Sequence, residues 1–253
     1  DPHASDYAHV LTEPIDENCF RCHANIEQEV RGAPAPHDAV FTGERCASCH
    51  DSHASGRADL IRDREDKLCL QCHDEPVRAR DGTMIEDIGD MLEGRQFLHG
   101  PIRDGQCSPC HNVHGASHSR LLNERFTEAF YAPFDLKNYA LCFDCHVQNL
   151  VQDEEATALT DFRDDGRNLH FVHVNRAEKG RTCRTCHEIH GSNLPRHIAE
   201  SVPFEGSGWA LPIRFRKLEN GGSCAPGCHE PMTYTRTPID ADEPAGEPEG
   251  GAP

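Results

Sequence analysis

The chain has 253 residues, a formal net charge of −18 and only 36% hydrophobic residues. That length suffices for one or two ordinary domains, but the hydrophobic content is thin for a conventional core of that size. The acidic charge argues against nucleic acid as a partner, and no run approaches the ~20 apolar residues of a transmembrane helix. The 14 cysteines and 18 histidines are therefore the features to explain.

Residues 1–34 introduce the motif on which the rest of the chain depends. They contain the run Cys19-Phe-Arg-Cys22-His23, preceded by His3 and His9. C-x-x-C-H is the attachment sequence of a c-type haem, in which both cysteines bond to the porphyrin and the adjacent histidine binds the iron. A proline-rich run at 33–36 then predicts a break in the chain, so this segment is expected to hold one haem.

Residues 35–90 form the first of three repeated modules. His37 comes first, and the string Cys46-Ala-Ser-Cys49-His50-Asp-Ser-His53 follows, with a second histidine three residues after the motif. A further site, Cys69-Leu-Gln-Cys72-His73, belongs to the same module. The pattern over 62–73 predicts a short helix that ends in this second site.

Residues 91–165 repeat this order with a longer spacer. His99 precedes the string Cys107-Ser-Pro-Cys110-His111-Asn-Val-His114, and the second site is Cys142-Phe-Asp-Cys145-His146. Short helices are predicted over 135–148, at the second site, and over 83–92, ahead of the module.

Residues 166–236 form the third module. Its string is Cys183-Arg-Thr-Cys186-His187-Glu-Ile-His190. Its second site, Cys224-Ala-Pro-Gly-Cys228-His229, has one extra residue between the cysteines. Pro226-Gly227 can form a tight turn that takes up this extra length, so the site is counted with the others.

The modules differ in the distance between their two sites. This distance is 23 residues from 46 to 69, 35 from 107 to 142, and 41 from 183 to 224, as expected for stacked repeats with loop insertions. The last residues are acidic and rich in Pro, Gly and Ala, a composition typical of disorder. The predicted organisation is a single-haem segment, three two-haem modules and a tail, at 1–34, 35–90, 91–165, 166–236 and 237–253.

Seven sites with two cysteines each account for all 14 cysteines. The predicted haem-attaching residues are Cys19, Cys22, Cys46, Cys49, Cys69, Cys72, Cys107, Cys110, Cys142, Cys145, Cys183, Cys186, Cys224 and Cys228. Zinc knuckles also use C-x-x-C, and disulfide frameworks also use many cysteines. Neither requires a histidine after every second cysteine, so the sequence predicts seven covalently attached haem c groups as cofactors.

Few residues remain to build a conventional fold. The chain contains 20 Gly and 17 Pro, and no run alternates as a strand would. The predicted fold class is mostly irregular and loop-rich, with short α-helices and little or no sheet, wrapped around the seven haems as in a multihaem cytochrome c. Flat apolar porphyrins would supply the buried surface that side chains lack, so the haem-free chain is expected to be largely unfolded.

The 18 histidines are enough to bind every iron from both faces. The predicted proximal ligands directly follow a cysteine pair and are His23, His50, His73, His111, His146, His187 and His229. The predicted distal ligands flank the strings or precede the first site and are His9 (or His3), His37, His53, His99, His114, His173 (or His170) and His190. His118 and His197 are assigned no ligand role, and the sequence leaves the pairing of distal ligands with haems open.

Covalent haem attachment takes place outside the cytoplasmic membrane, so the chain is expected to be exported. It starts at Asp1 with no basic, apolar leader, as expected for a protein whose signal peptide has been removed. The predicted location is extracellular or periplasmic, with no transmembrane segment.

The repeated strings resemble the doubled-CXXCH family of multihaem cytochromes over residues 35–236. The matching strings, each followed by a partner site, are 46–53, 107–114 and 183–190. The resemblance implies bis-histidine haems in close-packed stacked and T-shaped pairs, and electron transport between inner-membrane donors and outer or extracellular acceptors. Some similar cytochromes form extracellular filaments in which a histidine of one subunit binds a haem of the next, a role that would suit His3 and His9.

The predicted function is electron conduction, with no catalytic residue and with low-potential redox proteins or extracellular acceptors as partners. The alternative is a multihaem reductase of nitrogen or sulfur oxyanions or of metals, which needs an iron with an open coordination position. Histidines suffice for both faces of all seven irons, which favours the conduit. A monomeric carrier and a filament of copies remain two open arrangements, because spare N-terminal histidines favour assembly and the net charge opposes it.

Overall fold

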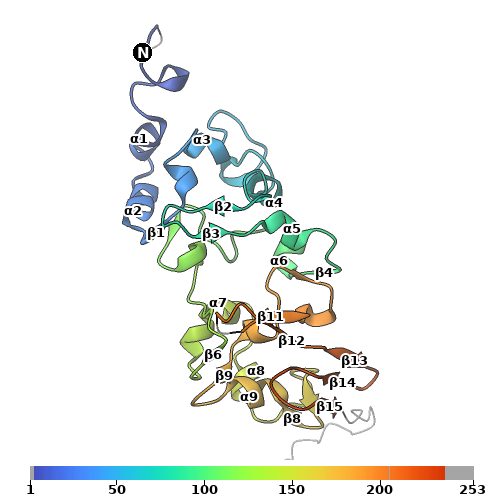
Figure 1. Cartoon of the computed structure of the whole chain (residues 1–253). Helices are drawn as coiled ribbons and strands as arrows, with labels where there is room; N and C mark the ends of the chain where they lie inside the picture. Colours follow the sequence, from blue (N-terminus) through green and yellow to red (C-terminus); the bar gives the residue numbers. More distant parts are fainter. Residues whose placement is uncertain (1–2, 205, 237–253) are drawn as a thin grey trace, which may run out of the picture.

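The computed structural model describes residues 3–204 and 206–236, and the molecule is elongated (Figure 1). The chain follows the long axis broadly in sequence order, so the N-terminal residues lie at one end and the third module at the other. The predicted acidic tail, 237–253, lies outside the described residues. Within the described part of the chain, no helix is long and apolar enough to cross a membrane.

The N-terminal segment consists of a 3-10 turn, η1 (Ala8–Val10), and two helices, α1 (Ile15–Phe20) and α2 (Ala24–Gly32). Two acidic residues in the first turn of α1 lie at the positive end of its dipole. Helix α2 ends where Ala33 turns extended, because the ring of Pro34 disfavours helical backbone at the residue before it. The predicted break after this segment is therefore present.

The modules are built from helices and 3-10 turns of three to six residues. They are η2 (Asp38–Val40), α3 (Cys46–Cys49), η3 (Ala58–Leu60), α4 (Glu65–Cys69), α5 (Ile88–Leu92), α6 (Gly100–Arg103), η4 (Ser119–Leu121), η5 (Leu136–Tyr139), α7 (Ala140–Phe143), α8 (Asn149–Gln152), α9 (Leu169–Val174), η6 (Cys183–Thr185) and η7 (Pro195–His197). The prediction of short helices in a loop-rich chain is confirmed.

Two predicted helices are shorter in the structure than in the prediction. Of 62–73 only α4 is helical, because the chain turns into the C-x-x-C motif from Cys69 onward. Of 83–92 the first part forms a strand, and α5 begins after Asp87, whose carboxylate accepts the N–H three residues on at 2.8 Å. The region 135–148 is divided between η5 and α7.

The structure contains more strands than the sequence analysis predicts, since little or no sheet is expected there. They are β1 (Ala35–Pro36), β2 (Val77–Arg78), β3 (Met84–Ile85), β4 (Phe97–Leu98), β5 (Gly115–Ala116), β6 (Tyr131–Ala132), β7 (Arg163–Asp164), β8 (Arg167–Asn168), β9 (Gly180–Arg181), β10 (Gly191–Ser192), β11 (Ser201–Pro203), β12 (Ala210–Pro212), β13 (Arg216–Leu218), β14 (Gly221–Cys224) and β15 (Met232–Thr235). Most have two residues, too few to show the alternation by which strands are recognised in a sequence. They pair antiparallel in two-stranded sheets and in one three-stranded sheet, β13-β14-β15.

Three of these small sheets join one module to the next: β1 pairs with β5, β4 with β10, and β6 with β9. Pro36 lies opposite Gly115, and Leu98 lies opposite Gly191. The first two of these pairings each bring the histidine that precedes one string beside the string of the next module. The first pairing requires glycine, because a Cβ at Gly115 (φ +157°) would lie 2.7 Å from the Cβ of Ala33.

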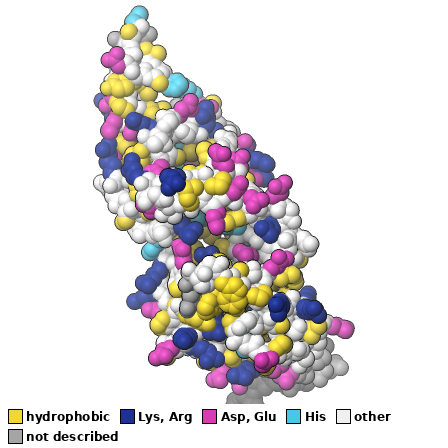
Figure 2. Space-filling model, viewed as in Figure 1, with side chains coloured by type: hydrophobic (Ala, Val, Ile, Leu, Met, Phe, Trp, Pro, Cys, Tyr) yellow, Lys and Arg dark blue, Asp and Glu magenta, His cyan; other side chains and the backbone are white. Residues whose placement is uncertain are grey.

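Buried apolar side chains gather mainly in the C-terminal half. The larger cluster contains Phe130, Ala199, Val202, Leu211 and Ile213, and a second contains Tyr139, Val151 and Val174. The face drawn in Figure 2 shows hydrophobic side chains in patches between acidic and basic ones. In the described residues before 125, the buried hydrophobic residues are Phe20, Val30, Ala116 and Leu122. The first modules thus have little core of their own.

Candidate cofactor-binding sites

The three strings position their motif histidine in the same way. In each, the Nδ1 atom of that histidine bonds to the backbone carbonyl nine residues later in the chain. The bonds join His50 to Asp59, His111 to Arg120 and His187 to Arg196, at 2.7, 2.9 and 3.0 Å. A histidine whose Nδ1 donates to a carbonyl keeps Nε2 as the acceptor that a metal ion requires.

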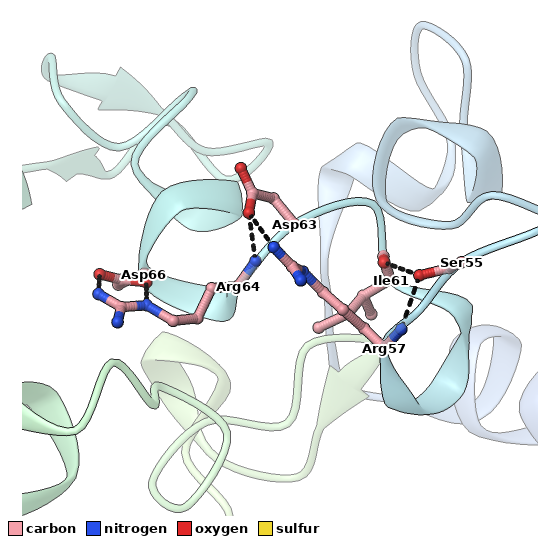
Figure 3. A network of polar contacts seen from close by, with 6 residues as sticks. All are labelled: Ser55, Arg57, Ile61, Asp63, Arg64 and Asp66. Carbon is pink, nitrogen blue, oxygen red and sulfur yellow. Dashed lines mark hydrogen bonds and ion pairs between the residues drawn. The ribbon is translucent and has the colours of Figure 1, made fainter.

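The accepting carbonyl lies in a turn with an unusual backbone. In η3, η4 and η7 two consecutive residues have positive φ, between 54° and 60°. In the first module Ser55 holds this turn: its Oγ donates to the Ile61 carbonyl at 2.7 Å and accepts the Arg57 N–H at 3.1 Å (Figure 3). Ser192 makes the equivalent bonds in the third module, at 2.6 and 2.9 Å. Such strain in non-glycine residues is retained where a site depends on the geometry.

Five of the seven motif histidines face a second imidazole with nearly parallel rings, at interplanar angles between 11° and 22°. The pairs are His37 with His73, His50 with His114 and His99 with His146 at 6.2 Å between ring centres, His111 with His190 at 6.5 Å, and His170 with His187 at 6.3 Å. With each nitrogen about 2 Å from a metal and each ring centre roughly 1 Å behind it, two ligands of one iron have ring centres about 6 Å apart. The paired rings therefore fit the two faces of a haem iron.

The pairs follow two rules. The histidine that precedes a string faces the second site of its own module, as His37 faces His73. The histidine that ends a string faces the first site of the preceding module, as His114 faces His50. The same two rules describe the next module, where the pairs are His99 with His146 and His190 with His111.

The strands between modules produce this arrangement. Next to the β1–β5 pairing, His37 Nδ1 bonds to the Val113 carbonyl at 2.9 Å. Next to the β4–β10 pairing, the backbone N–H of His99 donates to the His190 carbonyl at 3.2 Å. Each boundary thus holds two distal histidines side by side.

The third module uses both of the alternative histidines of the sequence prediction. Helix α9 carries His170, which faces His187, and His173, whose Nδ1 bonds to the Leu169 carbonyl at 2.7 Å. The pKa of His173 is lowered, chiefly by burial and in smaller part by charges that include His229. His229 is therefore near His173, and the last site has a candidate distal ligand of its own.

Burial lowers the pKa of several of these histidines and so favours the neutral imidazole. It lowers the pKa of His170 to about 3 and that of His190 to about 4, with the facing histidines adding to the effect. It also lowers the pKa of His111 and His187. A ring nitrogen must be unprotonated to bind a metal, so the buried sites suit iron ligation at neutral pH.

The cysteines of consecutive sites are neighbours along the described chain. Between modules the first cysteines of two motifs lie within hydrogen-bonding reach: Cys19 and Cys46, Cys69 and Cys107, Cys142 and Cys183. Within modules the second cysteines of two motifs interact: Cys49 and Cys72, Cys110 and Cys145, Cys186 and Cys228. Burial and these neighbours raise several thiol pKa values, to about 11 for Cys46 and about 12 for Cys186. The seven sites therefore form one series in sequence order.

Some predicted ligands have no imidazole opposite them. Among residues 3–204 and 206–236 no ring faces His23, His53 or His9. His197, assigned no ligand role from the sequence, lies edge-on to the distal His99 with 5.6 Å between ring centres. The position of His197 in the sequence does not indicate this packing role, because the contact depends on how η7 folds against β4.

Part of the chain matches the model of a known protein family. The family model of the doubled CXXCH motif matches residues 1–28, 37–78 and 99–150. No match to a curated protein was found. The third module lies outside the matched residues, and its second site is the one with an extra residue between the cysteines.

Proposed function

Because the chain carries the doubled CXXCH motif of multihaem c-type cytochromes, we propose that it is a heptahaem electron conduit. The observation that carries the proposal is the series of neighbouring attachment cysteines from the first site to the seventh. Attachment cysteines that are neighbours would bring the edges of two porphyrins close together, whatever the orientation of the rings. When bound, each haem supplies one-electron transfer, and the chain supplies placement, ligation and electrostatic tuning.

The five histidine pairs would supply both histidine ligands of five irons. Two imidazoles on one iron would leave no coordination position for a substrate, so these sites suit a carrier better than an oxyanion or metal reductase. The carbonyl bonds to Nδ1 fix the ring orientation and prevent the ligand from swinging away. Bis-histidine ligation also favours low potentials, which indicates low-potential redox proteins or extracellular acceptors as partners.

Covalent attachment of haem c also bears on location. We infer a periplasmic or extracellular protein, because that is where the attachment takes place. Assembly of copies into a filament is the arrangement that would extend the series beyond one chain.

Intact-mass measurement of the purified holoprotein tests the cofactor number. We expect the chain mass plus seven haem groups. Fewer attached groups, or loss of the groups on denaturation, would contradict covalent attachment at all seven motifs.

Carbon monoxide titration of the reduced protein tests the conduit against the reductase. We expect most haems to remain unreactive, since five of the motif histidines face a second histidine that can bind the same iron. Binding of carbon monoxide at most of the sites would show open irons and favour a catalytic role.

A further inference from the structure

The N-terminal residues repeat a later part of the chain with a fixed offset of 50 residues. The equivalent pairs are His3 and His53, Ser5 and Ser55, Ala8 and Ala58, Cys19 and Cys69, and His23 and His73. In this register the N-terminal residues correspond to the end of a string, its turn and the second site of a module. The haem site that begins a module has no counterpart within residues 1–253.

The fold repeats along with the sequence. In η1, His9 and Val10 both have φ of 60°, and the equivalent Asp59 and Leu60 in η3 have φ of 54° and 55°. The Ser5 hydroxyl donates to the carbonyl of Leu11 and accepts the backbone N–H of Tyr7 at 3.0 Å. Figure 3 shows the same two bonds made by Ser55. The N-terminal turn is thus built as the turns that hold a motif histidine are built.

Among the described residues, the N-terminal turn lacks two hydrogen bonds that the turn of the first module makes. The carbonyl of Asp59 accepts Nδ1 of His50, and the equivalent carbonyl belongs to His9. The N–H of Arg62 donates to the carbonyl of Cys49 at 2.9 Å, and its equivalent is the N–H of Thr12. In the described part of the chain no histidine ring bonds to the His9 carbonyl.

The two pairing rules indicate which partners His53 and His23 would take. A histidine that ends a string faces the first site of the preceding module, so His53 requires a motif ahead of the site at His23. A second site is faced by the histidine that begins its own module, so His23 requires a histidine further ahead still. Both side chains are exposed, and neither faces an imidazole among the described residues. Histidine side chains are visible near the N-terminal tip in Figure 2.

Near the opposite end, the described residues supply the second imidazole for the first site of the third module. By the same rules His187 would be faced by a histidine of a following module, and His170 takes that place. A second copy joined end to end would therefore present irons that already face two histidines. The family match gives an independent indication: residues 37–78 hold two motifs, whereas the matched residues 1–28 hold one.

We propose that the N-terminal end is the docking site for one more haem-bearing repeat unit, which consists of a leading histidine and a C-x-x-C-H motif. His53 is the distal ligand of that unit's iron, and the unit's leading histidine is the distal ligand of the haem at His23. The offset of 50 residues fixes how the unit joins. Its motif histidine occupies the position three residues ahead of His3, just as His50 lies three residues ahead of His53. This inference rests on the proposed haem attachment, which intact mass tests separately.

The first experiment supplies the unit as a copy of residues 33–50 fused directly ahead of Asp1. In the unfused holoprotein we expect one haem that binds carbon monoxide, the haem at His23. In the fusion we expect one additional haem by mass and no carbon monoxide binding. A fusion that gains its haem yet still binds one carbon monoxide per chain would overturn the proposal.

Matched variants assign the ligands in this experiment. His53→Ala should leave the spectrum of the unfused protein unchanged and should open one haem in the fusion. His37→Ala in the fused copy alone should open the haem at His23. His118→Ala should change neither protein. If His53→Ala opened a haem in the unfused protein, His53 would be the ligand of a resident haem and the proposal would fail.

A second experiment needs no folding of the fused segment. The probe is a free haem peptide with the sequence of residues 46–50, which carries a haem with one open position. We expect its spectrum to become low-spin at one peptide per chain with the unfused protein and not with His53→Ala. No conversion, or equal conversion with His53→Ala, would overturn the proposal. Carbon monoxide binding that falls as protein concentration rises, with dimers in sedimentation, would make a second copy the occupant instead.

Discussion

In the proposed holoprotein, single histidines decide which irons have histidine on both faces. His114 ends the second string, yet its ring faces His50 of the preceding module at 6.2 Å. Nothing in the chain order indicates this partner, because the two residues meet only when β1 pairs with β5. The motif histidines are predictable from the sequence because each directly follows the second cysteine of a motif. The distal pairing is not, because it is a property of strand register.

Replacement of His114 by alanine should open the haem at His50 and no other. We expect one further carbon monoxide site per chain and a high-spin signal, since one axial ligand is lost. Electron paramagnetic resonance and carbon monoxide titration measure this directly. His118→Ala is the matched control, and an unchanged spectrum of His114→Ala would exclude the pairing.

His170 and His173 should behave as ligands of two different haems. Each alanine variant is expected to open one iron, and the double variant two, because His170 faces His187 and His173 lies near His229. Carbon monoxide stoichiometry of the three variants measures the effect. Only one open iron in the double variant would mean that the two histidines serve the same site.

Short elements connect the modules and orient the ligands. Gly115 lies in β5 against Ala33, where a Cβ would clash at 2.7 Å. This strand could not be predicted, because two residues carry no alternation. The helices were predictable in kind, but α4 and α5 are shorter than the sequence pattern suggests because a motif turn and a neighbouring strand end them.

Replacement of Gly115 by alanine should loosen two haems at once. The change strains the β1–β5 pairing, which holds both His37 and His114 in place, so the irons at His73 and His50 should both lose ligation strength. Carbon monoxide affinity and redox titration measure this. Gly56→Ala is the control, since nothing lies within 4 Å of a Cβ built there. Weakened ligation at only one of the two irons would show that His37 and His114 are positioned independently of each other.

Glu65 in α4 links the first module to the string of the second. Its carboxylate accepts the N–H of Cys107 at 2.6 Å, and both the N–H and the hydroxyl of Ser108, at 2.9 and 2.8 Å. Burial alone raises the pKa of this carboxyl, but the three hydrogen bonds together outweigh burial and leave the pKa lowered. A lowered pKa means that the stabilising effect is present above the ordinary carboxyl pKa and is lost as pH falls through the folded value.

The variant Glu65→Gln should therefore lower the free energy of unfolding by about 1 kcal/mol at neutral pH, because a charged acceptor of several bonds is lost near the surface. The difference from the unchanged protein should vanish in acid. Denaturant titrations at several pH values measure this, with Glu75→Gln as an exposed control. A difference that persists below the ordinary carboxyl pKa would assign the effect to packing.

The whole molecule has few buried side chains for its length. The largest fully buried residues among those described are Tyr139, Leu211, Val30 and Asn168, and only Val30 belongs to the first half of the chain. Composition alone predicts this shortage, because 36% hydrophobic residues are too few to form a conventional core for a chain of this length. Where the small clusters lie was not predictable, because it depends on contacts such as those of β11 with β12.

The haem-free chain should lack a cooperative thermal transition. Without porphyrins, the buried apolar surface is too small to offset the conformational entropy of an ordered chain. Circular dichroism and calorimetry of protein produced without haem attachment measure this. A single sharp transition similar to that of the holoprotein would show that the polypeptide folds by itself.

In the proposed holoprotein, the backward reach of His114 and His190 would tie the second and third modules to the one before each through an iron, in addition to the paired strands. Stretching that holoprotein at such a boundary would load an imidazole–iron bond as well as the paired strands. Mechanical strength and electrical continuity thus depend on the same coordination bonds. Tension on a single tethered molecule should become visible as a change of colour.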